Sequence, residues 1–151
     1  RNTAMKSKNT IETDNGLTSD VSQNIQNNSE SNANRINDVK YVALKRTICA
    51  KYGTATVGIL LYSVRKNTID CLAVGEQYRG CGIATELVRR ALKILDCSRP
   101  VYVNTFPMGD EKGKAAHALY KKFGFLPSKE IGLEYGRTVQ KFVRSPFGGK
   151  Q

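Results

Sequence analysis

A glycine-rich turn between an apolar strand and an amphipathic helix constrains the fold of this chain more than any other feature. Residues 75–82 read Gly-Glu-Gln-Tyr-Arg-Gly-Cys-Gly and follow the largely apolar run 68–74. Apolar residues then recur at helical spacing from Ile83 to Leu95, which predicts an amphipathic helix. Such a turn presents backbone N–H groups at the positive end of a helix, an arrangement that binds anions. The alternative is a tight turn that needs glycine for its backbone angles alone.

Two familiar phosphate-binding motifs do not fit this turn. A Walker loop requires Gly-Lys-Ser/Thr at its end, and here Cys81 follows Gly80. A dinucleotide-binding fingerprint requires a third glycine or alanine, and that position is Thr85. The strands ahead of the turn also read as an antiparallel meander, whereas a Rossmann unit alternates strands and helices throughout.

The pattern of apolar and polar residues predicts six strands and two helices. Short polar or glycine-containing turns at 52–54 and 65–67 separate the first three strands, and Tyr135-Gly136-Arg137 separates the last two. Gly124 closes the second helix as a C-terminal cap, and the residues expected to face inward on that helix are Ala115, Ala116, Leu119 and Phe123. The expected strands are 47–51, 56–64, 68–74, 101–106, 126–133 and 138–144, and the expected helices are 83–95 and 114–123.

The order β-β-β-α-β-α-β-β predicts an α/β (α+β) fold with a mixed, mostly antiparallel sheet and helices on its faces. Because a helix connects Val74 to Val101, the two strands that meet there are expected to be central, parallel neighbours.

Composition divides the chain near residue 38. Residues 1–38 are rich in Asn and Ser and poor in large apolar side chains, so they bury too little to offset chain entropy and are expected to be weakly structured. One helical pattern is present there, at Leu17, Val21 and Ile25. Residues 39–151 are expected to form the folded domain.

Charge is distributed unevenly between these two parts. The chain has a net charge of +11; residues 1–38 carry 4 basic and 5 acidic side chains, whereas residues 39–151 carry 20 basic and 8 acidic ones. Such a basic domain suits an anionic partner: a cofactor with phosphates, a nucleic acid or an acidic surface. A soluble domain with a lysine-rich surface is the alternative.

The remaining composition excludes other classes of protein. Four cysteines without a C-x-x-C pair and one histidine provide no zinc site of the usual spacing, so no metal is expected and the thiols are expected to be reduced, as in the cytoplasm. No apolar run approaches the ~20 residues of a membrane helix. The first residues of the sequence contain no apolar stretch of the kind found in a signal peptide, so none is expected there.

Two segments carry a resemblance to a known family. Gln77, Gly80 and Gly82 match the pattern Q/R-x-x-G-x-G/A, and residues 118–125 resemble the ending A-x-x-L-Y-x-x-x-G-F. Both patterns, in this order, are similar to those of the GNAT superfamily of acetyl-CoA-dependent N-acetyltransferases. The resemblance spans about residues 46–144 and implies a GNAT fold whose central parallel strands splay apart.

The resemblance also implies a binding site for acetyl-CoA. The pantetheine arm is expected to lie between the splayed strands and to bond to backbone near Leu72 and Val74. The pyrophosphate is expected on the turn and the first helical residues, which are Gln77, Tyr78, Arg79, Gly80, Cys81, Gly82, Ile83 and Ala84.

Catalytic roles follow from the resemblance in part. Tyr120 matches the family tyrosine that protonates the departing thiolate; a packed helix tyrosine is the alternative. The general base is left open between Asp70, Glu76 and water, since Asp70 also fits an ordinary surface carboxylate. His117 is expected to face solvent, with a proton relay as the alternative.

The sequence departs from the family pattern in three places. Gly113 stands where many relatives have an asparagine that faces the cofactor, so this contact is expected to move to a neighbour such as Lys114. Cys81 replaces a residue that is often basic. Residues 1–45 match the first strand and helices of the family poorly, and residues 1–38 are therefore also compatible with a remnant of them.

The sequence thus predicts an acetyl-CoA-dependent N-acetyltransferase acting on a primary amine as a monomer or homodimer. The alternatives are a GNAT-type toxin that acetylates aminoacyl-tRNA, and a non-catalytic module that binds CoA or nucleic acid on the same fold. The toxin predicts salt-dependent affinity for tRNA, whereas the module predicts binding without turnover.

Overall fold

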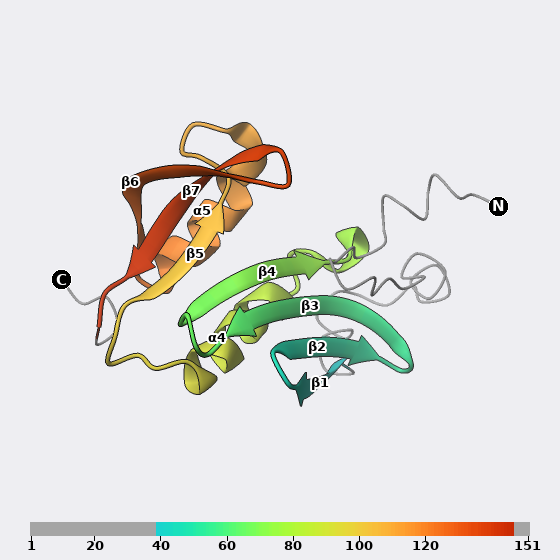
Figure 1. The fold of residues 1–151 in the computed structure, drawn as a ribbon. Coiled ribbons are helices and arrows are strands. Elements are labelled where there is room, and N and C mark those ends of the chain that lie inside the picture. The colour runs from blue at the N-terminus through green and yellow to red at the C-terminus, as the bar shows by residue number, and fades with distance from the viewer. Residues whose placement is uncertain (1–38, 147–151) are drawn as a thin grey trace. The chain divides into compact units, whose positions relative to one another are not determined.

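The computed structural model describes residues 39–146 as a mixed sheet with two α-helices (Figure 1). The predicted helical pattern at Leu17, Val21 and Ile25 lies outside the described residues. Within the described part, the chain forms two compact units. Unit 1 contains residues 39–61 and 71–91, and unit 2 contains residues 62–70 and 92–146.

The strand order of the sheet is β1-β2-β3-β4-β5-β7-β6. Strands β4 and β5 are parallel, with Thr68 opposite Tyr102 and Ile69 opposite Val103. This confirms the predicted mixed sheet and its central parallel pair. The strands are β1 (Val39–Leu44), β2 (Thr47–Tyr52), β3 (Ala55–Ser63), β4 (Thr68–Val74), β5 (Val101–Thr105), β6 (Phe125–Glu134) and β7 (Arg137–Arg144).

Strand β1 was not predicted. It pairs antiparallel with β2 at the edge of the sheet, and Val39 is its one buried residue. An edge strand with so little burial needs no alternation of apolar and polar residues, so its sequence carries no strand pattern. The other six strands lie where the sequence predicts them, within two residues at each end.

In unit 1, helix α4 (Ile83–Ile94) packs against the meander through the face that the sequence predicts. A close approach at Gly58 makes this possible, since a Cβ there would lie 2.9 Å from Ile83 Cγ2 and 3.2 Å from Leu87 Cδ1. The opposite face of α4 is polar, and Arg90 bonds to Glu86 across one turn. Burial of the apolar face therefore holds the first turns of α4 against β3.

In unit 2, β5, β7 and β6 are antiparallel neighbours, accompanied by helix α5 (Lys114–Lys122). The β6–β7 hairpin closes through Tyr135 and Gly136, whose φ angles of 53° and 78° are those of a two-residue hairpin turn. The predicted turn is thus confirmed.

The predicted inward face of α5 was wrong in part. The sequence placed Ala115, Ala116, Leu119 and Phe123 inward, but Ala115 is exposed and the other three are half-buried. Tyr120 is the buried residue of this helix. The larger ring of Tyr120 gains more from burial than the small alanines do, so the helix is rotated to bury it.

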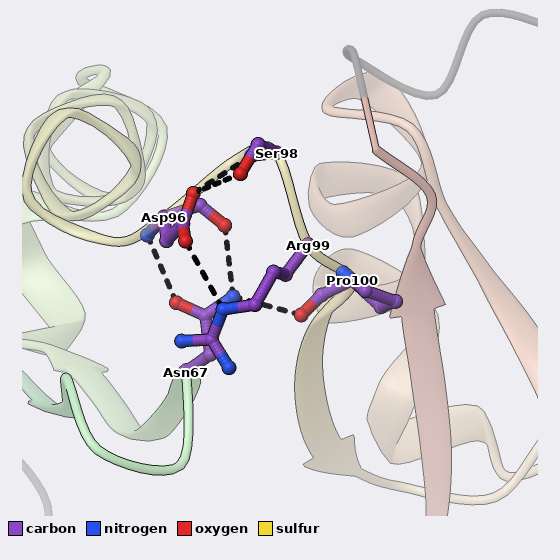
Figure 2. A network of polar contacts seen from close by, with 5 residues as sticks. All are labelled: Asn67, Asp96, Ser98, Arg99 and Pro100. Atoms are coloured by element: carbon purple, nitrogen blue, oxygen red, sulfur yellow. Dashed lines mark hydrogen bonds and ion pairs between the residues drawn. The ribbon is translucent and has the colours of Figure 1, made fainter.

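A buried asparagine ties two loops of unit 2 together (Figure 2). The Nδ2 group of Asn67 donates to the carbonyl oxygens of Asp96, at 2.9 Å, and Pro100, at 2.8 Å, and its Oδ1 accepts from the Asp96 amide at 2.9 Å. Asn67 is 1% exposed and has a left-handed φ of 60°. The β3–β4 turn is therefore held against the loop that leads into β5.

Candidate active site

The glycine-rich turn lies in unit 1 and is built as a short 3-10 turn, Glu76–Tyr78, between β4 and α4. The Gly75 amide donates to the Val57 carbonyl at 2.9 Å, which anchors the turn on β3. The Tyr78 ring is 0% exposed and packs at a tilt against Tyr52, with ring centroids 6.0 Å apart. The side chain of Tyr78 is therefore a core residue, and its backbone is the part that lies in the turn.

Gly80 and Gly82 both adopt left-handed backbone angles, with φ of 79° and 90°. Residues with a side chain rarely adopt these angles, so both positions need glycine for the backbone. A Cβ added at either position would meet no atom within 4 Å. The space in front of both glycines is thus open. The backbone angles explain why both positions are glycine, and the open space leaves room for the anion that the sequence predicts here.

Helix α4 begins directly after this turn. The Glu86 amide donates to the Gly82 carbonyl at 3.0 Å, which is the first helical hydrogen bond. The first amides of a helix have no intrahelical acceptor, and they give its N-terminus a partial positive charge. The predicted contacts Ile83 and Ala84 occupy this first turn, with the Ile83 side chain buried.

Arg79 and Cys81 flank Gly80 with different contacts. The Arg79 Nε donates to the Val74 carbonyl at 3.2 Å, so its guanidinium is held beside the end of β4. The Cys81 thiol lies 3.8 Å from the Arg79 carbonyl as a long sulfur hydrogen bond. All four cysteines of the chain have free thiols in the structure.

Strand β4 carries the other predicted cofactor contacts and the candidate base. Leu72 is half-buried and Val74 is buried. Asp70 is exposed, and one of its carboxylate oxygens accepts a hydrogen bond from the Thr68 hydroxyl at 2.7 Å. An exposed aspartate bonded to a neighbouring threonine is the arrangement of a surface carboxylate, and it leaves the second oxygen outside this bond.

Tyr120 lies in unit 2, in the last turn of α5. It is 4% exposed, and its ring meets Phe125 edge-on with centroids 5.5 Å apart. Lys114 lies at the start of the same helix, fully on the surface, with its ammonium 3.6 Å from a carboxylate oxygen of Glu111. The predicted residues thus fall into two groups: the turn, Leu72 and Val74 in unit 1, and Asp70, Lys114 and Tyr120 in unit 2.

The expectation that His117 faces solvent was wrong. Its Nε2 lies 2.6 Å from the Phe106 carbonyl oxygen, and its ring stacks on Phe142 with centroids 5.2 Å apart. A Cβ at Gly113 would lie 2.7 Å from His117 Cε1 and 2.5 Å from Phe106 Cβ. The imidazole thus fills the space beside Gly113, which explains why this position is glycine here. No sequence pattern pointed to this contact, because it joins α5 to the end of β5.

Residues 39–146 contain no group of three or more His, Cys, Asp or Glu side chains that could hold a metal ion. The described helices are all too short or too polar to span a bilayer.

The sequence matches the model of the acetyltransferase (GNAT) family over residues 19–125. This chain belongs to the GNAT family. The match covers the glycine-rich turn, α4, β5 and α5, and it begins inside the polar segment 1–38. The resemblance drawn from the two motifs is thereby confirmed. No curated protein matches the sequence significantly.

Solved structures of GNAT enzymes share the fold. The chain is similar to the ribosomal-protein-S18-alanine N-acetyltransferase from Escherichia coli, with a TM-score of 0.55 and 14% identity over 94% of this chain and 84% of that one. It is also similar to a GCN5-related N-acetyltransferase from Rhodopseudomonas palustris, with a TM-score of 0.53 and 18% identity over 66% of this chain. This chain spans 60% of the length of that protein. The chain is also similar to a chain of the NatC complex bound to Gag peptide and CoA, with a TM-score of 0.50 and 24% identity over 66% of this chain and 70% of that one.

Proposed function

We propose that this GNAT domain binds acetyl-CoA and transfers its acetyl group to a primary amine by direct attack within a ternary complex. Acetyl-CoA is the acetyl donor of the family to which the chain belongs. The observation that carries the proposal is the pair of left-handed glycines, Gly80 and Gly82, with open space before them at the start of α4. A helix N-terminus reached through such glycines is a phosphate-binding arrangement.

In this proposal the turn binds the pyrophosphate of acetyl-CoA. Backbone amides from Gln77 to Ala84 would donate to its oxygens, and Tyr78 would contribute through its backbone because its ring is buried. The guanidinium of Arg79, held by the Val74 carbonyl, would add a positive charge beside the turn. Cys81 would lie between the two glycines without contributing a charge.

Strand β4 would hold the pantetheine arm and the thioester. The register of β4 with β5 covers Thr68 and Ile69, so backbone groups at Leu72 and Val74 lie beyond this pairing. Their amides would bond to the arm and stabilise the negative charge that develops on the thioester oxygen. Exposed Lys114 would contact an anionic part of the same molecule.

The chemical step needs one base and one acid. The acceptor nitrogen forms a bond to the thioester carbon and loses a proton, for which we propose Asp70 as the receiving group. The carbon–sulfur bond then breaks, and the departing thiolate takes a proton from the Tyr120 hydroxyl. We propose that residues 39–151 form this domain and that residues 1–38 precede it as a polar segment.

Calorimetric titration of the full chain with acetyl-CoA tests the cofactor site. The Gly82→Asp variant places a carboxylate where the pyrophosphate is proposed to lie, and binding should be lost. Gly136→Asp is a matched control, since Gly136 also has a left-handed φ, of 78°, and no atom within 4 Å of a Cβ. The control should keep wild-type affinity. Equal affinity in both variants would remove the turn from the cofactor site.

The role of Tyr120 is tested by turnover. Release of free CoA thiol is measured with the best acceptor from a panel of lysine peptides, peptides with free N-termini, small amines and aminoacyl-tRNA. Tyr120→Phe keeps the ring that packs on Phe125, so it should lower kcat by about 10²-fold while leaving the affinity for acetyl-CoA nearly unchanged. Tyr135→Phe, in the exposed hairpin turn, should have no effect. A Tyr120→Phe variant with full activity at every pH contradicts the assignment.

A further inference from the structure

One end of the unit 2 sheet brings four chain segments side by side. The Tyr102 amide donates to the Asn67 carbonyl at 3.2 Å, so the β3–β4 turn lies beside the start of β5. Val101 is paired with Arg144 at the end of β7, and Arg144 is paired with Phe125 at the start of β6. Neighbouring strands are about 4.8 Å apart, so this row of four strand ends is about 14 Å wide.

Cations gather beyond this row. The β3–β4 turn, the last turn of α4 with the loop after it, and the last turn of α5 each contribute two exposed basic residues. The carboxylate in these segments is Asp96, and it already bonds to Ser98 and Arg99. We call this surface the basic edge: Arg65, Lys66, Lys93, Arg99, Lys121 and Lys122.

The segments that carry these charges are fixed relative to one another. Asn67 bonds to backbone of Asp96 and Pro100, which joins the turn of Arg65 and Lys66 to the loop of Arg99 (Figure 2). At the other side of the row, the Arg144 Nε donates to the Phe123 carbonyl at 2.7 Å, just after the last turn of α5. Segments held together in this way present their basic side chains at a constant spacing, which suits a partner with matching negative charges.

The most exposed apolar side chains of unit 2 lie at the opposite end of the sheet. Ile131, Leu133 and Tyr135 of the β6–β7 hairpin are 57%, 74% and 82% exposed. The neighbours of the basic edge are aliphatic and less exposed: Val64 at 52%, Ile94 at 40% and Leu126 at 52%. Proteins that lie on anionic membranes place large apolar side chains beside their cations, so this separation favours a polyanion over a lipid surface.

We propose that the basic edge binds the phosphodiester backbone of a structured nucleic acid. Lysine ammonium and arginine guanidinium groups would contact successive phosphates across the row. Binding through these six cations would depend on backbone shape and salt rather than sequence. The basic edge includes none of the residues proposed to bind acetyl-CoA, so its test requires no cofactor.

Fluorescence anisotropy of the full chain with a labelled RNA hairpin, between 50 and 200 mM KCl, tests the proposal. Six phosphate contacts predict a slope of log K against log[salt] of about −4 to −5. Replacing Arg65, Lys66, Lys121 and Lys122 by Gln should make this slope less negative by about 3 to 4, and affinity at low salt should fall about tenfold or more.

A matched control separates the basic edge from overall charge. A second variant replaces four exposed cations elsewhere by Gln and has the same net charge as the first: Lys40, Lys112, Lys129 and Arg137. It should keep the wild-type slope. Far-UV circular dichroism establishes that both variants are folded.

Three results would overturn the proposal. They are equal loss of binding in both variants, no RNA binding at 50 mM salt, and tighter binding to phosphatidylserine vesicles that depends on the same four residues. A DNA duplex of the same sequence forms the last arm. A slope equal to that for RNA supports recognition of the backbone alone, and weaker binding of DNA supports recognition of A-form backbone geometry.

Discussion

The bonds of Asn67 lead to a quantitative prediction. Asn67→Ala removes one donor group that serves two carbonyls, at 2.9 and 2.8 Å, and one acceptor, at 2.9 Å. Asn67 is 1% exposed, so water cannot fully replace these bonds. Each is worth about 1 kcal/mol. The left-handed φ of 60° costs Ala about 1 kcal/mol more, since asparagine tolerates this angle better. The expected loss in the free energy of unfolding is about 4 kcal/mol.

Two further variants divide this loss into its parts. Asn67→Gly loses the same hydrogen bonds but adopts the left-handed angle freely, so it should cost about 3 kcal/mol. Ser98→Ala removes an exposed hydroxyl that bonds to Asp96 in the same loop, at 2.6 Å, and should cost less than about 0.5 kcal/mol. The loss of stability should therefore be largest in Asn67→Ala, smaller in Asn67→Gly and smallest in Ser98→Ala. This order follows from the burial of each side chain and the backbone angle of residue 67.

Urea unfolding followed by far-UV circular dichroism measures these differences, since the chain has no tryptophan. With a slope of about 1–1.5 kcal/mol per M, a loss of 4 kcal/mol lowers the midpoint by about 3 M, if a folded baseline remains. A loss below 1 kcal/mol in Asn67→Ala, or a glycine variant less stable than the alanine variant, would refute the reasoning.

Three other predictions follow from the packing and from the pKa directions. Gly113→Ala should lower the free energy of unfolding by about 1–3 kcal/mol in a thermal melt, because its Cβ would lie 2.5 Å from Phe106 Cβ and 2.7 Å from His117 Cε1. Hydrogen bonds, first from Ser98, lower the pKa of Asp96 below that of an ordinary aspartate. The ionised carboxylate therefore stabilises the fold above the ordinary pKa, and this stabilisation is lost as pH falls through the lowered pKa. In Asp96→Asn, the free energy of unfolding should therefore depend less on pH in this acidic range. Burial raises the pKa of the Cys49 thiol, which is 4% exposed, so iodoacetamide at pH 8 should label it more slowly than Cys81, as mass spectrometry would show.

The strong periodic patterns of the sequence were sufficient for most of the fold. The apolar runs predicted β3 and β4, and the i, i+4 spacing from Ile83 predicted α4 and its buried face. The Tyr135-Gly136 turn was readable because left-handed angles in two-residue hairpins select such residues. These features are local, so a short stretch of sequence contains all the information that determines them.

Edges and short helices were less readable. Strand β1 buries little, so nothing in its residues marks a face. Helix α5 offers several small or apolar residues on adjacent faces, and the choice of Tyr120 as its buried residue depends on Phe125 in β6. The position of His117 likewise depends on Phe106, just after β5, and on Phe142 in β7.

The sequence alone determined the glycine-rich turn, the order of the elements from residue 47 onward and the family, because each rests on residues close together in the chain. Only the tertiary structure decided that Gly80 and Gly82 are left-handed with open space before them, and that His117 fills the space beside Gly113. It also decided that Asn67 joins two loops and that the starts of β5 and β6 and the end of β7 lie side by side. These features depend on residues that are distant in sequence. Strand pairing and packing bring such residues together, and no local sequence pattern predicts which ones will meet.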